Sequence, residues 1–285
     1  VLNGSVVGNI YGGNQTAVTG NELNVYDSVT ASNIKNFDTV NFKAMSSHIA
    51  VGDTLLTLNG GATNLDWKKL YVDNLDSLNA SATSDTILTL MRHTANNINL
   101  ANYSTTGTRG RIHSSDYEAD IMTDGNSATP QNIYLRGYRF QNNTTTYAGG
   151  TATDAWGGRS RIGNKVQNNK LTLTGGSATL VARGGLVSNT ELDAHGNPKT
   201  TGDAEKNKLI LNTGANTLNA YGAEVRTKSG SAADNTATLN AGTVNGSLYG
   251  ASLSAAGATG SATKNKVEIK GGAVTGSVYG SHIAD

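Results

Sequence analysis

The sequence predicts an all-β protein, a parallel β-helix in which short strands stack coil upon coil. Three observations predict this fold: a recurring strand-like segment, a matching recurrence of Tyr-Gly pairs, and many glycines with few prolines. The recurring segment begins with asparagine, at Asn169, Asn207, Asn235 and Asn265. The last three are 28 and 30 residues apart, and Tyr-Gly pairs repeat these two intervals, at Tyr221, Tyr249 and Tyr279. A fixed period of this length indicates a solenoid.

Each repeat has the pattern of strand, turn and strand. In the segment 266–270, Val267 and Ile269 alternate with charged residues, so an extended strand places both on one face. The glycine pair at 271–272 then allows a turn, and a second apolar run ends at Tyr279. One such coil cannot bury its inward face alone. Successive coils must therefore stack in parallel and share a long apolar core.

The composition fits a thin core and excludes several classes of function. The chain has 35 glycines, two prolines and 36% hydrophobic residues, as expected for continuous sheet that proline would interrupt. The formal net charge is +1, which gives no electrostatic reason to expect nucleic acid as a partner. Because cysteine is absent, disulfides, thiolate zinc sites and a thiol nucleophile are excluded. No apolar run is long enough to be a transmembrane segment.

The rhythm of the repeat divides the chain into four regions. Residues 1–30 contain a coil remnant that starts inside a repeat, which indicates a fragment of a longer protein. Residues 31–100 form less regular coils, in which Asp53–Leu58 and Asp85–Leu90 match each other and predict stacked strands. The repeat disappears over 101–150, which we interpret as an insertion or an elaborated coil. Residues 151–285 form regular coils of about 28–38 residues, with Trp156 at the tyrosine position of the first.

The repeats resemble those of a known class of secreted proteins. The motifs concerned are the Asn-Lys strand starts, the stretch 36–56, Gly8-Asn-Ile-Tyr-Gly-Gly13, Trp156-Gly-Gly-Arg-Ser160, Gly246-Ser-Leu-Tyr-Gly250 and Gly276-Ser-Val-Tyr-Gly280. They are similar to repeats in the passenger domains of Gram-negative autotransporters, the type V secreted surface proteins. The resemblance implies a right-handed parallel β-helix, extracellular and displayed at the cell surface on the outer membrane. It also implies a role in adhesion or virulence.

Three functional hypotheses follow. The first is a non-enzymatic adhesin that binds a protein or glycan on a host cell or on another bacterium. The second is a structural stalk or self-associating fibre segment, and the third is a polysaccharide-active β-helix enzyme. We expect no enzyme activity and no cofactor, because the Gly-Asp-Ser-Gly motif of the serine-protease autotransporters is missing and acidic residues do not recur at the coil period.

One acidic cluster is a candidate cation site. Asp116, Glu118 and Asp120 lie at alternate positions, so on a strand all three carboxylates project from one face. Such a row can hold calcium or perform acid–base chemistry on sugars. The alternative interpretation is a solvated outer face whose charges keep an edge soluble.

The interval 101–150 also carries the candidate residues for partner binding. Tyrosine and arginine supply contact area and hydrogen bonds at recognition surfaces, and an irregular excursion is a common place for them. The candidates are Tyr117, Tyr134, Arg136, Tyr138 and Arg139. The alternative is a covering strand whose aromatic side chains pack on the coils. By contrast, tyrosines that recur at the coil period are expected to stack on one another as scaffold.

Overall fold

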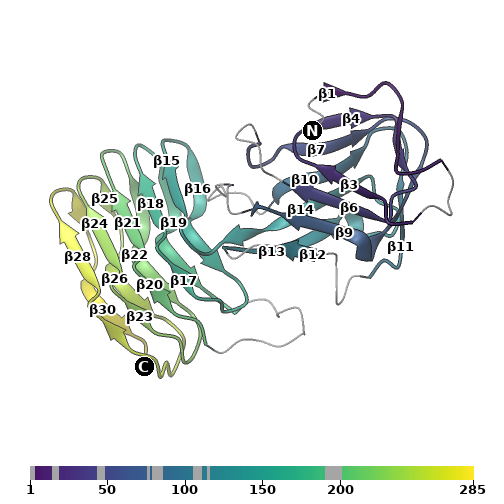
Figure 1. Ribbon diagram of the computed structural model, residues 1–285. Helices are drawn as coiled ribbons and strands as arrows, with labels where there is room; N and C mark the ends of the chain where they lie inside the picture. The colour runs from purple at the N-terminus through teal and green to yellow at the C-terminus, as the bar shows by residue number, and fades with distance from the viewer. Residues whose placement is uncertain are drawn as a thin grey trace. The chain divides into compact units, whose positions relative to one another are not determined.

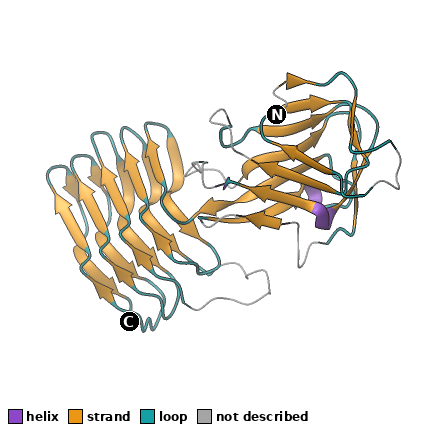
Figure 2. Cartoon of the chain, in the orientation of Figure 1, coloured by secondary structure: helices purple, strands orange, loops and turns teal. Residues whose placement is uncertain are grey.

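The chain folds into two compact units of β-strands (Figure 1). The computed structural model describes residues 4–14, 19–43, 49–75, 78, 86–104, 111–113, 116–189 and 201–285. Unit 1 comprises Val1–Asn79 and Asp85–Gly137, and unit 2 comprises Ala80–Ser84 and Tyr138–Asp285. Strands dominate both units, and the helical segments described are short 3-10 turns (Figure 2). The prediction of an all-β chain with parallel sheets is confirmed.

Unit 1 is built from short strands and two 3-10 turns among the described residues. The strands are β1 (Gly4–Ser5), β2 (Asn9–Tyr11), β3 (Glu22–Val25), β4 (Val29–Ala31), β5 (Asn33–Lys35), β6 (Thr39–Lys43), β7 (Thr54–Leu58), β8 (Thr63–Asp66), β9 (Leu70–Asp73), β10 (Thr86–His93), β11 (Ile98–Ala101), β12 (Arg111–His113), β13 (Tyr117–Thr123) and β14 (Asn132–Arg139). The 3-10 turns are η1 (Trp67–Lys69) and η3 (Asp124–Asn126).

The strands of unit 1 form four sheets. The largest has the order β1-β4-β7-β10-β14-β13, and the others are β12-β9-β6-β3, β11-β8 and β2-β5. The pairs β7–β10, β3–β6 and β6–β9 are parallel, whereas β10 and β14 are antiparallel. The predicted stacking of β7 on β10 is confirmed, but Thr54 pairs with Thr89 and not with Thr86. Similar Thr-Leu patterns therefore identify the neighbouring strands without fixing their register.

Unit 2 repeats a set of three strands. They are β15 (Thr144–Tyr147), β16 (Thr151–Ser160), β17 (Val166–Gln167), β18 (Lys170–Leu173), β19 (Ser177–Val187), β20 (Ala204–Glu205), β21 (Lys208–Leu211), β22 (Asn216–Val225), β23 (Ala232–Ala233), β24 (Thr236–Leu239), β25 (Thr243–Val244), β26 (Leu248–Leu253), β27 (Ala262–Thr263), β28 (Lys266–Ile269), β29 (Ala273–Val274) and β30 (Val278–Ile283). The segments β25–β26 and β29–β30 correspond to the single long strands of earlier repeats.

Strands of unit 2 that recur at the repeat period lie side by side in three parallel sheets. The long sheet contains β16, β19, β22, β25, β26, β29 and β30; the middle sheet has the order β15-β18-β21-β24-β28; and the short sheet has the order β17-β20-β23-β27. The register joins Lys208 to Thr236 and Thr236 to Lys266, which confirms the predicted intervals. Alternation of apolar and polar residues gives each strand one inward face.

Two apolar clusters form the core of unit 2. The first lies between the middle and long sheets, where leucines such as Leu171 and Leu209 meet small residues such as Ala182 and Ala220. The second lies beside the short sheet, where Val166 and Ala204 meet Val187 and other residues near the ends of the long strands. Tyr221 and Glu224 belong to neither cluster and project from the outer face of the long sheet.

A ladder of asparagines, buried except for the half-buried last member, joins the repeats of unit 2. Its members are Asn143, Asn169, Asn207, Asn235 and Asn265, and each precedes a strand of the middle sheet. The backbone N–H of Asn169 donates to Oδ1 of Asn207 at 3.1 Å, and that of Asn207 donates to Oδ1 of Asn235 at 2.9 Å. The Asn207 side chain also donates to the carbonyl of Val166 at 2.9 Å. Backbone groups at the corner of each repeat are thus satisfied inside the protein.

The residue before each ladder asparagine has a left-handed backbone. These residues are Asn142, Asn168, Lys206, Asp234 and Lys264, with φ of 53° to 56°. Asparagine and aspartate tolerate this region better than most residues, and it turns the chain sharply into the middle sheet. The corner is therefore a repeated feature of the backbone.

The interval 101–150, predicted as an insertion or elaborated coil, contributes to sheets in both units. β13 and most of β14 belong to unit 1, whereas β15 begins the middle sheet of unit 2 and pairs with β18. The predicted regular region 151–285 lies wholly within unit 2.

Candidate binding site

The acidic residues Asp116, Glu118 and Asp120 lie in or just before β13. Asp116 and Glu118 are buried, and Asp120 is half-buried, so a fully solvated outer face does not describe this cluster. Within the part of the chain that the structure describes, no group of three or more His, Cys, Asp or Glu residues is placed to hold a metal ion.

Three of the five predicted partner-binding residues are in the interior. Tyr117 is buried and its phenol donates a hydrogen bond to the carbonyl of Leu78. Tyr138 and Arg139 are also buried, and Nε of Arg139 donates to the carbonyl of Gln141 at 2.9 Å. Because these three side chains are buried, they do not form the partner-binding patch that the sequence suggests. The alternative, packed aromatics on a covering strand, describes them better.

Tyr134 and Arg136 remain partly accessible. Both lie on β14, where they alternate with the buried residues Ile133 and Leu135. Successive side chains of the strand thus alternate between its two faces, and these two stay candidates for contact with a partner.

Tyr138 belongs to a cluster in unit 2 that we call the arginine–aromatic cluster. Its members are Tyr138, Trp156, Arg159 and Arg161. The Tyr138 and Trp156 rings meet edge to face, with centroids 5.6 Å apart and an interplanar angle of 76°. Cζ of Arg159 lies 4.7 Å from the centroid of Tyr138 and 4.9 Å from that of Trp156. Cζ of Arg161 lies 4.7 Å from the Tyr138 centroid. Aromatic faces attract cations, so the rings fix both guanidinium groups.

Arg159 lacks an acidic partner. Its Nε is buried without a hydrogen-bond acceptor, and among the described residues no carboxylate pairs with its guanidinium group. The side chain as a whole is half-buried. Arg159 is therefore a cation held in place by aromatic rings and left with donors for an external acceptor.

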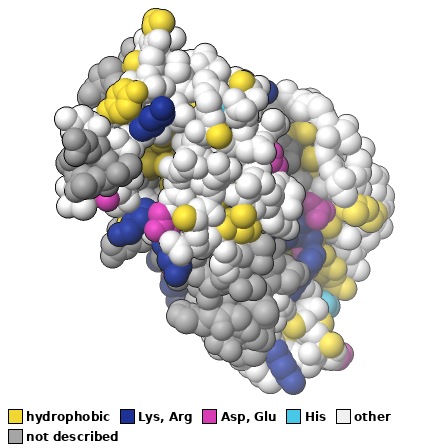
Figure 3. Space-filling view, turned by 90° about the vertical axis from the view of Figure 1, so that its right-hand side faces the viewer, with side chains coloured by type: hydrophobic (Ala, Val, Ile, Leu, Met, Phe, Trp, Pro, Cys, Tyr) yellow, Lys and Arg dark blue, Asp and Glu magenta, His cyan; other side chains and the backbone are white. Residues whose placement is uncertain are grey.

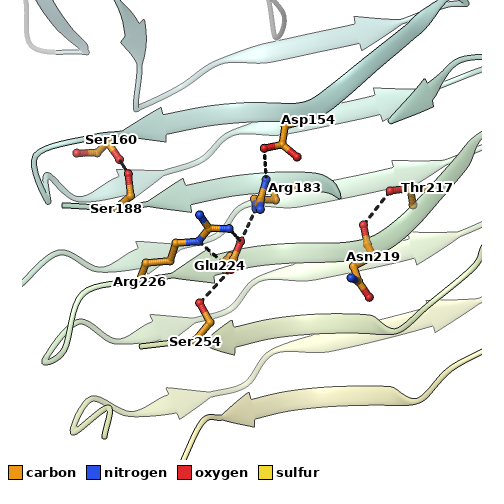
Figure 4. A network of polar contacts seen from close by, with 9 residues as sticks. All are labelled: Asp154, Ser160, Arg183, Ser188, Thr217, Asn219, Glu224, Arg226 and Ser254. Carbon is orange, nitrogen blue, oxygen red and sulfur yellow. Dashed lines mark hydrogen bonds and ion pairs between the residues drawn. The ribbon is translucent and has the colours of Figure 1, made fainter. Parts of the chain in front are cut away.

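A charge network continues from this cluster across the outer face of the long sheet (Figure 4). Nη1 of Arg183 lies 3.6 Å from Oδ2 of Asp154, and its Nε pairs with Glu224 on the adjacent strand. Arg226 donates to both oxygens of Glu224, at 2.9 and 3.1 Å, and Ser254 donates to Oε1 at 2.9 Å. Each carboxylate of the network thus faces at least one guanidinium group.

Burial and the neighbouring arginines shift the pKa of Glu224 in opposite directions. Burial alone would raise the pKa of this carboxyl, but the charges and hydrogen bonds of Arg183 and Arg226 outweigh it. The pKa of Glu224 consequently lies below its ordinary value, and the group is ionised at neutral pH. Glu224 therefore holds its two ion pairs, with Arg183 and Arg226, at neutral pH.

The predicted tyrosine ladder is confirmed on the same face. Tyr221 and Tyr249 stack with centroids 4.6 Å apart and planes 4° from parallel, and Tyr249 and Tyr279 stack at 5.1 Å and 8°. The register of the long sheet joins Trp156 to Arg183 and then to this ladder, so Trp156 does occupy the tyrosine position. Burial raises the pKa of Tyr221 to about 12, with a further contribution from the charge of Glu224.

One pair on this face has the chemistry of a nucleophile and a base. Oγ of Ser252 and Nδ1 of His282 lie 3.2 Å apart on adjacent strands. The register places Glu224 beside Ser252 and not beside His282, and the arginines occupy the Glu224 carboxylate. A catalytic triad needs the acid on the histidine, so this arrangement lacks the group that would orient the base.

A pocket in unit 1 is too small for an organic ligand. It is lined by residues including Trp67, Tyr103, Ile121 and Thr123, and its volume is about 10 Å³. That volume suits one water molecule.

The remaining findings concern the distribution of charge on the surface and the length of the helices. On the face of Figure 3, uncharged side chains and backbone predominate, and lysine or arginine side chains occur in small scattered groups. No helix of the described residues is long and apolar enough to cross a bilayer.

Sequence reasoning identified Trp156 and the tyrosines but missed the arginines beside them. A sequence signal for these arginines exists in the columns of the long sheet, meaning the sets of residues that pair with one another from strand to strand. Aligning the repeats at the strand register places Arg183 in the column of Trp156 and Tyr221, and places Arg159 in the column of Glu224. The alignment therefore places these charged residues in the columns of the tyrosine ladder and of Glu224, although Arg183 and Glu224 pair diagonally between the two columns.

Comparison with protein-family models, curated proteins and solved structures finds no match to this chain.

Proposed function

We propose that this chain is a non-enzymatic binding segment of a bacterial surface or secreted protein, comparable to the adhesin-like passengers of Gram-negative autotransporters. Unit 2 is, in this proposal, a right-handed parallel β-helix. Support comes from the three parallel sheets, each entered once per repeat, and from the strong preference of parallel crossovers for a right-handed path. The motifs shared in style with autotransporter passengers also support it.

The observation that carries the proposed function is the unpaired guanidinium group of Arg159. A charge placed among aromatic rings without a partner loses hydration and gains only a modest attraction from the rings. An external anionic group would supply the missing hydrogen bonds and charge. Binding of an anionic partner therefore explains why Arg159 is held in this position, whereas stabilisation of the fold does not.

The enzyme hypothesis has weaker support. A polysaccharide enzyme needs paired carboxylates with different pKa values in a cleft. The carboxylates of the long sheet, Asp154 and Glu224, instead face arginines. The pair Ser252 and His282 lacks an acid on the histidine side.

A stalk or self-associating segment is the second candidate. The buried asparagine ladder gives a stiff stack that suits a spacer. Large apolar side chains in the last strands of the middle and long sheets are exposed, with Ile269 at 52% and Val278 and Ile283 at 46%. Exposed apolar surface of this kind favours association.

A cell-binding experiment tests the proposal. The purified chain carrying a fluorescent label is titrated onto epithelial cells and onto bacteria, together with the variants Arg159→Gln and Lys208→Gln. Lys208 is exposed on the middle sheet and serves as the control for loss of one positive charge. We expect saturable binding that Arg159→Gln weakens and Lys208→Gln leaves unchanged.

Folded protein that binds no cell would contradict the adhesin proposal. Concentration-dependent oligomers in size-exclusion chromatography, together with absent cell binding, would favour the stalk. Circular dichroism and thermal unfolding establish that each variant is folded.

A further inference from the structure

The outer face of the long sheet offers more than a single cation. Trp156, Arg183, Tyr221, Tyr249 and Tyr279 occupy one column that crosses five adjacent strands. At the usual spacing between strands, this column spans roughly 19 Å. Arg159 lies at its Trp156 end and contacts that ring. The column therefore places Trp156 and three tyrosines, with the buried Arg183 between them, beside the fixed charge of Arg159.

The stacked tyrosines present edges and hydroxyl groups to an approaching molecule. Because Tyr221 and Tyr249 cover each other's ring faces, a ligand running along the column meets ring edges and phenol oxygens. Tyr279 is 37% exposed, and Tyr221 and Tyr249 are half-buried. Burial raises the pKa of Tyr221, so its hydroxyl stays a hydrogen-bond donor at neutral pH.

The charge at the end of the column selects a planar anion. A guanidinium group matches a carboxylate through two parallel N–H to oxygen bonds, a geometry that an ammonium group cannot offer. Arg226 already binds both oxygens of Glu224 in this way, and Arg183 pairs with Glu224 and lies near Asp154. Each carboxylate of the network thus faces an arginine, whereas Arg159 pairs with no carboxylate among the described residues.

The flat sheet face favours a sugar chain over a peptide. Peptides commonly bind a sheet at its edge, through backbone groups that are unpaired there. Across this face the backbone groups of the strands are committed to their parallel neighbours. What the face offers is side chains alone: hydroxyl groups, ring edges and one guanidinium group.

From these features we infer that the column of the long sheet binds a carboxylate-bearing polysaccharide, with Arg159 pairing with a sugar carboxylate and the tyrosine ladder lying along the chain. This inference rests on the proposed binding function and names the class of partner for that site. It requires no metal ion and no covalent step.

Titration with defined polymers tests the inference. Oligomers of polygalacturonate are titrated into the intact chain, and binding is followed by calorimetry and by the fluorescence of Trp156. A neutral galactan, dextran sulfate and polyglutamate of similar length are titrated in parallel. We expect the uronate polymer to bind most tightly and its affinity to fall as salt is raised.

Variants locate the site. Arg159→Gln should weaken uronate binding about tenfold, the loss expected for one charged bidentate contact. Arg159→Lys keeps the charge but loses the fork and should weaken binding by a smaller factor. Lys208→Gln, the matched control on the middle sheet, should bind as the wild type does. If Arg159→Gln fails to fold, Arg159→Lys still decides the question.

Each other outcome has a defined meaning. Equal binding of uronate and neutral polymers, or unchanged binding by Arg159→Gln and Arg159→Lys, overturns the inference. Tighter binding of dextran sulfate identifies a sulfate site, and tighter binding of polyglutamate identifies an acidic-peptide site, and either result also overturns it. If cells are bound but the uronate polymer does not compete, the binding function stands and this ligand class fails. If no cell is bound, the binding function itself fails.

Discussion

At the scale of single residues, the asparagine ladder explains why one residue type recurs at the start of each strand of the middle sheet. The side chain of Asn207 accepts from the backbone of Asn169 and donates to the carbonyl of Val166 in the same preceding repeat. It also donates to Asn235 in the following repeat at 3.0 Å. Aspartate could accept but not donate, and leucine could do neither, so the position selects asparagine.

Asn207→Ala should lower the free energy of unfolding by about 3 kcal/mol, because it leaves a buried N–H group of Asn169 without an acceptor. Chemical denaturation followed by circular dichroism measures the change. Asn212→Ala is the matched control, since Asn212 hydrogen-bonds its neighbours on the solvated side of the stack. Its effect should stay below about 0.5 kcal/mol. Equal losses of unfolding free energy in the two variants would show that the buried asparagine ladder stabilises the fold no more than a solvated asparagine does.

At the scale of elements, a column of glycines decides how closely the long and middle sheets approach. Its members are Gly157, Gly184, Gly222, Gly250 and Gly280, and consecutive members are neighbours in the stack. A Cβ atom at Gly222 would lie 2.3 Å from the carbonyl oxygen of Gly250 and 2.7 Å from the backbone of Thr236. Any side chain here would push two strands apart.

Gly222→Ala should therefore destabilise unit 2 by about 2 to 3 kcal/mol, because backbone atoms cannot move aside as a flexible side chain can. Thermal unfolding and hydrogen exchange of the amides in β22 and β26 measure the effect. Gly61→Ala supplies the comparison, since nothing lies within 4 Å of a Cβ at that position. A small loss in Gly222→Ala, with unchanged exchange in both strands, would mean that the sheets separate easily.

The elements of unit 2 are also where prediction from sequence succeeded. The intervals of 28 and 30 residues, the alternation in each strand and the stacking of Tyr221 on Tyr249 all follow from periodicity, because equivalent residues must meet in a repeating stack. The antiparallel pairing of β10 with β14 has no periodic signal and was not predicted. The right-handed path of the chain through the sheets stays a prediction.

The candidate site was harder to predict for a related reason. The sequence predicts Tyr138 and Arg139 as surface residues, because an irregular, aromatic-rich interval is typical of a binding loop. They are buried, since Tyr138 packs on Trp156 of the first regular coil. Arg159 depends on that same contact between an irregular strand and a regular one. Periodicity within the repeats carries no information about such a contact.

At the scale of the whole molecule, the charge network links the stability of the protein to pH. The folded-state pKa of Glu224 is lowered, so its stabilising effect is present above the unfolded value of 4.5 and is lost as pH falls through the lower folded value. Glu224→Gln should cost about 3 kcal/mol at pH 7, because buried Arg183 loses its hydrogen-bonded carboxylate and keeps only the longer contact with Asp154. The gap in unfolding free energy between wild type and variant should narrow as the pH falls below 4.5.

Urea unfolding of both proteins across this pH range measures the gap. Glu268→Gln is the control, because Glu268 pairs with Lys266 on an exposed strand and its removal should cost little at any pH. A gap between wild type and Glu224→Gln that stays constant down to pH 3 would show that the ion pairs of Glu224 do not stabilise the fold.

The asparagine ladder also has a direction. The side-chain oxygens of Asn207, Asn235 and Asn265 accept from the side chain of the repeat before, so one N–H group of Asn169, Asn207 and Asn235 donates to the repeat after. The amide dipoles consequently point the same way and add along the stack, much as peptide dipoles add along a helix. We expect unit 2 to be electrically polar along its stacking axis, negative toward Asn143 and positive toward Asn265. A chain with a net charge of +1 would then present opposite potentials at the two ends of one stack.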